Sequence, residues 1–302
     1  TISGEGAGHY LPGTDGQHGD WCHRSRLAEV DQVKLPGVPK KINLGCSGAK
    51  SSDIGFGDKL HYDESSQAAR LTAVAERYRV VAVVVGTGAN DDPQFANTLT
   101  TCVGDWLNGT SCFAGFGDEW RARVRRMRPK VASALTDVRT AMSRAHYARS
   151  DYSLVLQSYA APVGPDIAPG LQGLAGCPLR TDDLRWIRNT GVTVLDNGLR
   201  AVAKKTGTRF LDLSRAGIGH EACSGGKDIA QEWFTRLTVD WQDLVHDDRA
   251  PHALQASFHP NARGYKEFAG CLTEFLGTDT REASCLPGTN GTLHAAQLVP
   301  PR

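Results

Sequence analysis

The apolar residues of this chain form two alternating kinds of pattern. Nearly continuous apolar and β-branched runs, typical of strands buried on both faces, occur at 79–85, 153–158 and 208–213, with a shorter candidate at 41–44. Apolar residues at steps of three and four predict helices. The predicted helices lie at 65–78, 120–142 with a kink or restart at Pro129, 182–205 behind Thr181 as cap, and 262–277.

Strands that alternate with helices indicate an α/β fold, a parallel sheet with helices on both faces. Residues 1–40 are rich in glycine and proline and predict loops, and a disulfide-braced loop is expected at 102–112. The tail after Cys285 is expected to lie along the surface. We find no repeat and no long linker, so residues 1–302 are expected to form one domain.

Composition narrows the class of protein. The 302 residues are 40% hydrophobic with a formal net charge of +1, which gives no global attraction to nucleic acid. No apolar run approaches the ~20 residues of a membrane span. The eight cysteines form no CxxC pair, so metal-site spacing is absent, and their even count favours disulfides over eight buried thiols. We therefore expect a secreted protein whose leader has been removed, and no metal or organic cofactor.

Candidate chemistry lies in three loops that could meet at the carboxyl edge of the sheet. His259 precedes Pro260 and a predicted N-cap, Asn261, so it sits on a short loop anchored by a helix, as a general base requires. Asn90 follows a buried strand and offers an amide donor, and Gly48 offers an unobstructed N–H. Two such donors could hold an oxyanion. Taken singly, each of these residues also fits an ordinary turn or surface loop.

The chain resembles the SGNH, or GDSL, esterases and lipases, in particular their secreted actinobacterial branch. The segments that carry the resemblance are Ser3-Gly4-Glu5-Gly6-Ala7-Gly8, Tyr10-Leu11-Pro12-Gly13, Cys22-His23-Arg24-Ser25, Cys46-Ser47-Gly48-Ala49, Gly88-Ala89-Asn90-Asp91 and Phe258-His259-Pro260-Asn261. The resemblance implies a flavodoxin-like three-layer α/β/α hydrolase with Gly48 and Asn90 as oxyanion donors and His259 as base. It also suggests the pairings Cys22–Cys46, Cys102–Cys112 and Cys177–Cys223, which leave Cys271–Cys285.

The sequence departs from the family pattern in two places. The family often has Asp three residues before the histidine, where this chain has Ala256. The Ala256 carbonyl is the expected orienting group, with Asp243, Asp247 and Asp248 as weaker alternatives. The family's nucleophile lies in Gly-Asp-Ser at the end of the first strand, and alignment places that serine immediately before Thr1. We expect the first strand, ending in Gly-Asp-Ser, to sit beside Thr1, either as a cleaved N-terminal fragment that stays docked or as a continuous segment ahead of Thr1.

Two other residues in the sequence are candidate nucleophiles. Gly45-Cys46-Ser47-Gly48-Ala49 approaches the G-x-S-x-G elbow, with Ala49 where glycine is expected. Thr1 could act through its own amine. The expected function is a secreted carboxylic-ester hydrolase acting on a lipid or acylated polymer. The alternatives are an acyltransferase on the same site and a catalytically silent binding protein.

A dense basic run covers residues 121–130. A solvated helix face is the simpler interpretation. The sharper hypothesis is a contact surface for anionic lipid or polymer.

Overall fold

The structure is a computed structural model that describes residues 2–58, 60–239, 252, 254–289 and 291–297. Thr1, Asp243, Asp247 and Asp248 therefore lie outside the described residues. Five strands form one sheet, in the order β1 (Ala82–Val85), β2 (Ser153–Gln157), β3 (Arg209–Asp212), β4 (Glu282–Pro287) and β5 (Leu293–Gln297). The first four are parallel, and β5 is antiparallel to β4.

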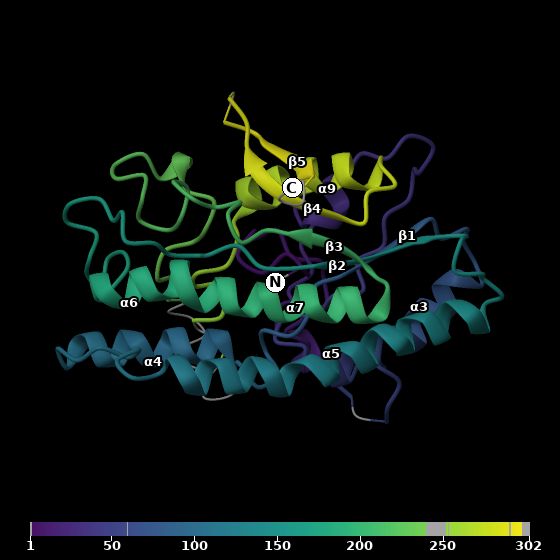
Figure 1. The fold of residues 1–302 in the computed structure, drawn as a ribbon, viewed down its shortest axis with the longest axis horizontal. Coiled ribbons are helices and arrows are strands. Elements are labelled where there is room, and N and C mark those ends of the chain that lie inside the picture. Colours follow the sequence, from purple (N-terminus) through teal and green to yellow (C-terminus); the bar gives the residue numbers. More distant parts are fainter. Residues whose placement is uncertain (1, 59, 240–251, 253, 290, 298–302) are drawn as a thin grey trace, which may run out of the picture.

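Helices cover both faces of this sheet, which gives three layers (Figure 1). The α-helices are α1 (Glu29–Gln32), α2 (Ser51–Ile54), α3 (Gln67–Ala75), α4 (Phe95–Leu107), α5 (Gly117–Arg144), α6 (Thr181–Trp186), α7 (Val192–Thr206) and α9 (Ala262–Leu276). Short turns of other helix types are η1 (Gln17–Gly19), η2 (Ile187–Gly191) and η3 (Ile229–Gln231). Among the described helices, none is long and apolar enough to cross a bilayer.

Alternation along the central strands explains the two cores. In β2, Val155 belongs to the core that contains α9, whereas Leu154 and Leu156 belong to the core that contains α5 and α7. In β3, Leu211 belongs to the core that contains α9, and Phe210 belongs to the core that contains α5 and α7. Because both faces of these strands are covered, nearly every position must be apolar. That is the reason for the continuous runs in the sequence.

The long periodic segments are confirmed, although α3 is shorter than the predicted 65–78 and α5 extends beyond 120–142 at both ends. Pro129 lies inside a continuous α5 rather than at a restart. The helix predicted at 182–205 is α6 and α7 joined by a π-helical turn, and Thr181 is its first helical residue rather than its cap. Asn261 is confirmed as a cap, since its side chain accepts hydrogen bonds from the N–H groups of Arg263 and Gly264. The donor–acceptor distance is 3.0 Å in each.

Three expectations about secondary structure are wrong. Residues 41–44 form no strand, because a groove separates them from β1 and they have no ladder partner. The segment after Cys102 is not a loop throughout, because α4 continues to Leu107. The tail after Cys285 does not simply lie on the surface, since β4 and β5 extend the sheet and bury Leu293.

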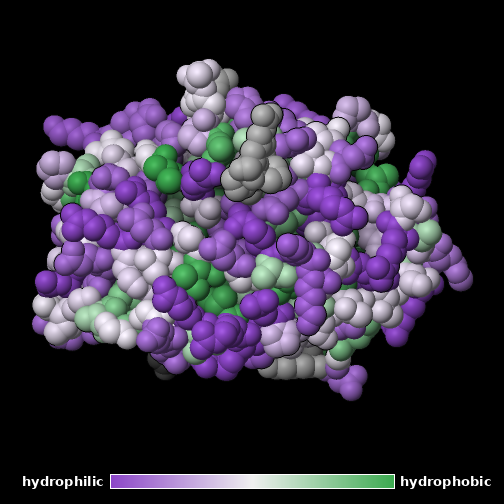
Figure 2. Space-filling view, in the orientation of Figure 1, coloured by the Kyte–Doolittle hydropathy of each residue, from purple (hydrophilic) through white to green (hydrophobic). Residues whose placement is uncertain are grey.

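The surface is mainly hydrophilic on the face that Figure 2 shows, with hydrophobic side chains in small, separate patches. Half of the basic run on α5 is neutralised by acids. Lys130 Nζ lies 2.7 Å from Asp92, and Arg123 Nε lies 3.0 Å from Glu119. These pairs fit a solvated helix face. No observation adds support for a contact surface for anionic lipid.

All eight cysteines are paired, which confirms the four expected disulfides. The bonds are Cys22–Cys46, Cys102–Cys112, Cys177–Cys223 and Cys271–Cys285. Cys22–Cys46 and Cys177–Cys223 each join two loops, Cys102–Cys112 joins α4 to a loop, and Cys271–Cys285 joins α9 to β4. Because a disulfide stabilises mainly by restricting the unfolded chain, a bond that closes a longer loop should contribute more.

Removal of individual disulfides should therefore follow loop length. Cys177–Cys223 spans 46 residues and Cys102–Cys112 spans 10. Replacing both cysteines of the longer loop by serine should lower the free energy of unfolding by about 4 kcal/mol, against about 3 kcal/mol for the shorter loop. Urea denaturation of the two double variants measures this order. A larger loss from the Cys102–Cys112 variant would contradict the entropic account.

Candidate active site

The three loops singled out in the sequence line one cavity of about 380 Å³. Gly48, Asn90 and His259 all contribute to its wall. Asn90 follows β1, where the carboxyl ends of parallel strands create a crevice. The structure therefore brings together the three residues that were expected to form the site. The remaining wall is largely apolar, with Phe95, Leu99, Val103, Phe234, Leu237 and Phe268 among its residues.

The loop of His259 is held by its own backbone. His259 N–H donates to the Ala256 carbonyl over 3.3 Å, and the Thr235 hydroxyl donates to the same carbonyl over 2.5 Å. The ring atom Nδ1 instead lies 3.2 Å from the Ser257 carbonyl oxygen. The expectation that the Ala256 carbonyl orients the ring is thus corrected to Ser257. An Nδ1–H bond to that carbonyl leaves Nε2 as the basic nitrogen.

Burial keeps His259 neutral. It lowers the pKa of the imidazole from its ordinary value near 6.5 to about 4. The charged form loses hydration in the cavity wall, and the neutral ring is the form that can accept a proton. The ring is therefore neutral above about pH 4, which is the state that a general base requires.

Two hydrogen-bonded contacts lock the loops of Gly48 and Asn90 together. Asn90 Nδ2 donates to the Ala49 carbonyl over 3.2 Å, which leaves the second amide hydrogen for another acceptor. Asp91 accepts from the Ser51 hydroxyl over 2.7 Å and from the Ser51 N–H. Gly48 adopts φ of 75°, a left-handed conformation in which a side chain would be strained. The two donor-bearing loops are consequently fixed relative to each other.

Ser47 does not lie in a nucleophile elbow. It is 2% exposed, and its side chain hydrogen-bonds to Glu5. Residues 2–46 contain no strand and α2 begins only at Ser51, so the strand–turn–helix context of that motif is missing. Ser47 thus has neither the exposure nor the setting of a nucleophile.

A second, apolar groove of about 490 Å³ lies beside β1. Residues 37–45 form one wall and residues 79–86 form the other, with side chains of α3 and α9 behind them. β1 is the edge strand of the sheet and faces this groove. Ile2, Glu29 and Gly86 line both the groove and the site cavity, so the two spaces meet.

A buried acid marks the place where the groove meets the cavity. Glu29 is 2% exposed and accepts a hydrogen bond from Gln157 Nε2 over 2.7 Å. Its other oxygen, Oε1, and Gln157 Oε1 have no hydrogen-bond partner among the described residues. Burial raises the pKa of Glu29 to about 7, and the hydrogen bond from Gln157 offsets only part of this effect.

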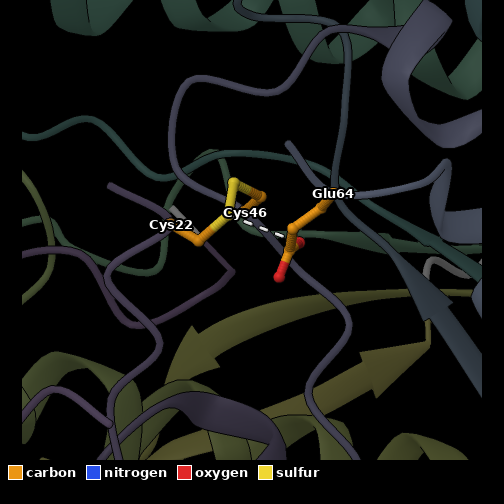
Figure 3. Close-up of side chains that lie close together, drawn as sticks. All are labelled: Cys22, Cys46 and Glu64. Carbon is orange, nitrogen blue, oxygen red and sulfur yellow. Dashed lines mark hydrogen bonds between the residues drawn. A yellow bond between two sulfur atoms is a disulfide. The ribbon is translucent and has the colours of Figure 1, made fainter. Parts of the chain in front are cut away.

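Cys22, Cys46 and Glu64 form a compact cluster, shown in Figure 3. The two sulfur atoms are joined in a disulfide, so they are not thiolate ligands. Glu64 also accepts hydrogen bonds from the guanidinium groups of Arg24 and Arg70. The cluster thus reinforces the fold, and Glu64 is already engaged by two cations.

Sequence reasoning missed Glu5, Glu29, Asp91 and Gln157. Asp91 and Glu5 stand inside the quoted motifs, but only their neighbours were assigned roles. Glu29 and Gln157 lie 128 residues apart, and no local pattern indicates their contact. Gln157, a polar residue at the end of a buried strand, is a local signal for this pair, whereas Glu29 lies in the polar turn Glu29–Gln32 and gives none.

An α/β/α sheet with a histidine, an amide and a glycine N–H around one cavity defines a hydrolase-like architecture. Residues 4–267 match the GDSL-like Lipase/Acylhydrolase family, and the chain belongs to that family. The family assignment agrees with the resemblance seen in the sequence. It establishes an ester hydrolase at the level of the family.

Individual relatives agree with this assignment. The chain is 25% identical over 246 residues to Lipase 2 of Streptomyces coelicolor, which covers 77% of this chain and 73% of that protein. An extracellular lipase from Streptomyces rimosus superimposes with a TM-score of 0.56 and 24% identity over 87% of this chain and 90% of the other. Phospholipase A1 from Streptomyces albidoflavus superimposes with a TM-score of 0.54 and 23% identity over 92% of this chain and 95% of the other. The two solved structures share the fold.

The raised pKa of Glu29 predicts how stability depends on pH. A carboxyl with a higher pKa in the folded state binds an extra proton between about pH 4.5 and 7, so the free energy of unfolding falls as the pH rises through that window. Glu29→Gln should remove this loss, and at pH 8 it should be more stable than the wild type by up to about 3 kcal/mol.

Urea denaturation from pH 5 to 8 measures the difference between wild type and Glu29→Gln, both consisting of residues 1–302 with no other segment in the groove. The exposed Glu76 provides the control, because Glu76→Gln should show no such trend. A difference between wild type and Glu29→Gln that stays constant over this pH range would contradict the assignment.

Proposed function

We propose that the protein is a secreted carboxylic-ester hydrolase that uses serine acyl-enzyme chemistry. The observation that carries this proposal is the single cavity lined by His259, Asn90 and Gly48. A base and two hydrogen-bond donors around one space are the groups that acyl transfer requires. The four disulfides and the extracellular lipase among the structural relatives support secretion.

The chemistry follows from the roles of these groups. His259 Nε2 takes the proton of the serine hydroxyl as the serine oxygen attacks the ester carbonyl. The Gly48 N–H, the free Asn90 amide hydrogen and the serine's own N–H stabilise the resulting oxyanion. The histidine then gives its proton to the departing alcohol. Water, deprotonated by the same histidine, attacks the acyl-enzyme and releases the carboxylic acid together with the free serine.

The apolar wall of the cavity favours an acyl chain as the bound part of the substrate. Phe95, Leu99 and Val103 from α4 face this space together with Phe234 and Leu237. Burial of each methylene there is worth about 0.8 kcal/mol. The lipase and phospholipase names of the relatives agree with a lipid ester. We propose a lipid or another acylated molecule as the substrate.

We further propose that the nucleophilic serine comes from an extended segment ahead of Thr1 that fills the groove beside β1. Three features of the structure support this placement. The groove is apolar and follows an edge strand, it meets the site cavity, and two buried oxygen atoms without partners lie where the two spaces meet. A strand added there would supply hydrogen-bond partners to the open edge of β1. Its end would reach the cavity next to His259.

Replacing His259 tests its role as the base. His259→Ala should lower turnover of a p-nitrophenyl ester by about 10²–10⁴-fold with little change in the fold. His294→Ala on β5 is the control, since His294 lies outside the cavity and should leave the rate unchanged. In the unaltered enzyme the rate should fall as the pH drops through about 4, where His259 becomes protonated. A near-normal rate in His259→Ala would remove the histidine from the mechanism.

A serine-directed fluorophosphonate tests the origin of the nucleophile. We expect intact mass to show material beyond these 302 residues and peptide mapping to place the label on a serine outside them. Label on Ser47 would overturn this proposal and move the nucleophile to the loop after Cys46. A mass equal to 302 residues with no label would also overturn it, and would favour a binding protein that lacks catalysis.

A further inference from the structure

Glu5 is a buried carboxylate packed beside the loop of His259. Its side chain is 0% exposed, and Gln255 Nε2 donates to its Oε2 over 2.8 Å. The Tyr265 hydroxyl donates to the Glu5 backbone carbonyl over 2.9 Å. The next residue, Gly6, lies so close to the loop that a Cβ there would be 2.9 Å from His259 Cβ. The start of the chain and the histidine loop therefore form one packed unit.

The other groups around Glu5 keep its carboxylate ionised. His23 Nδ1 lies 2.8 Å from Oε2, and the Tyr10 hydroxyl donates to Oε1 over 3.1 Å. Burial alone would raise the pKa of Glu5, but the hydrogen bond with His23 and the charges that His259 and His23 can carry lower it to about 2. Among the described residues, the phenols of Tyr62 and Tyr265 also interact with the charge of Glu5.

A nearby negative charge would stabilise His259 in the protonated form that arises when it acts as a base. When the ring takes a proton, a positive charge appears in a site where burial already disfavours the charged form. The Ser257 carbonyl that orients Nδ1 has a dipole but no net charge. Ala256 occupies the position where the family often has an aspartate. Residues 254–261, the described part of the histidine loop, thus contain no acid.

We propose that Glu5 is a positioning residue that compensates the positive charge of protonated His259, while the Ser257 carbonyl sets the ring orientation. This inference rests on the proposed role of His259 as the base. Because Glu5 is shielded from solvent, its charge acts on the ring through a medium of low dielectric. Gln255 links the histidine loop to Glu5, because its Nε2 donates to Glu5 Oε2. The same Nε2 also donates to the Trp21 carbonyl.

The direct test is the pKa of His259, measured by NMR titration of the imidazole signals in the full chain. Glu5→Gln keeps the size of the side chain and removes the charge, so the pKa of His259 should fall by roughly 1. Asp183→Asn is the matched control. Asp183 is also a buried carboxylate, but its hydrogen bonds go to residues 111–113, so the pKa of His259 should not change.

The titration needs no turnover, so its result does not depend on whether the chain hydrolyses esters. With ester turnover available, Glu5→Gln should lower kcat by about tenfold, with KM nearly unchanged, since each pKa unit corresponds to a factor of ten. If Glu5→Gln does not fold, Glu5→Asp retains the charge and should keep the pKa of His259 closer to the wild-type value than Glu5→Ala does. Equal pKa values of His259 in folded wild type and Glu5→Gln, or in Glu5→Asp and Glu5→Ala, would overturn the proposal.

Discussion

The ionised carboxylate of Glu5 is the interaction on which the site depends most. A buried charge is costly unless its hydrogen bonds are satisfied, so every group that binds it must be in place at once. His23 comes from the loop closed by the Cys22–Cys46 disulfide, Gln255 from the histidine loop, and Tyr10 from the loop that follows Glu5. One carboxylate therefore joins parts of the chain that are up to 250 residues apart. Their relative positions define the wall around His259.

The loops of Gly48 and Asn90 are rigid because their polar groups are also held by hydrogen bonds within the protein. The contact from Asn90 to Ala49 and the contacts from Asp91 to Ser51 tie the loop after β1 to the start of α2. These groups are held before a substrate arrives, so little reorganisation is needed when an oxyanion forms. The ordinary polar contacts of a turn thus serve a second purpose, because they set the distance between two hydrogen-bond donors.

The sequence predicted the features that depend on local patterns. Buried strands such as β2 and the apolar stripe of α9 are local, and so is the setting of His259 between a proline and a cap. The predicted partner of the His259 ring was wrong because the choice between neighbouring carbonyls depends on the local backbone conformation, which the residue pattern does not specify. Phe258 adopts φ of 59°, an uncommon conformation, and the Ser257 carbonyl rather than that of Ala256 then contacts Nδ1. Glu5 and Glu29 were missed because their partners are distant in sequence.

The groove and the cavity share Ile2, Glu29 and Gly86, which links completion of the sheet to completion of the site. An acid at such a junction is tolerated without a partner only in its neutral form, and this is consistent with the raised pKa of Glu29. A strand docked beside β1 would offer a hydrogen-bond donor to Glu29 Oε1 and would favour the ionised form again. The protonation state of Glu29 should therefore report whether the groove is filled. Docking of the strand would change the protonation state of Glu29, whereas ester hydrolysis at His259 does not require Glu29. The state of this one carboxyl therefore distinguishes docking of the strand from the chemistry at His259.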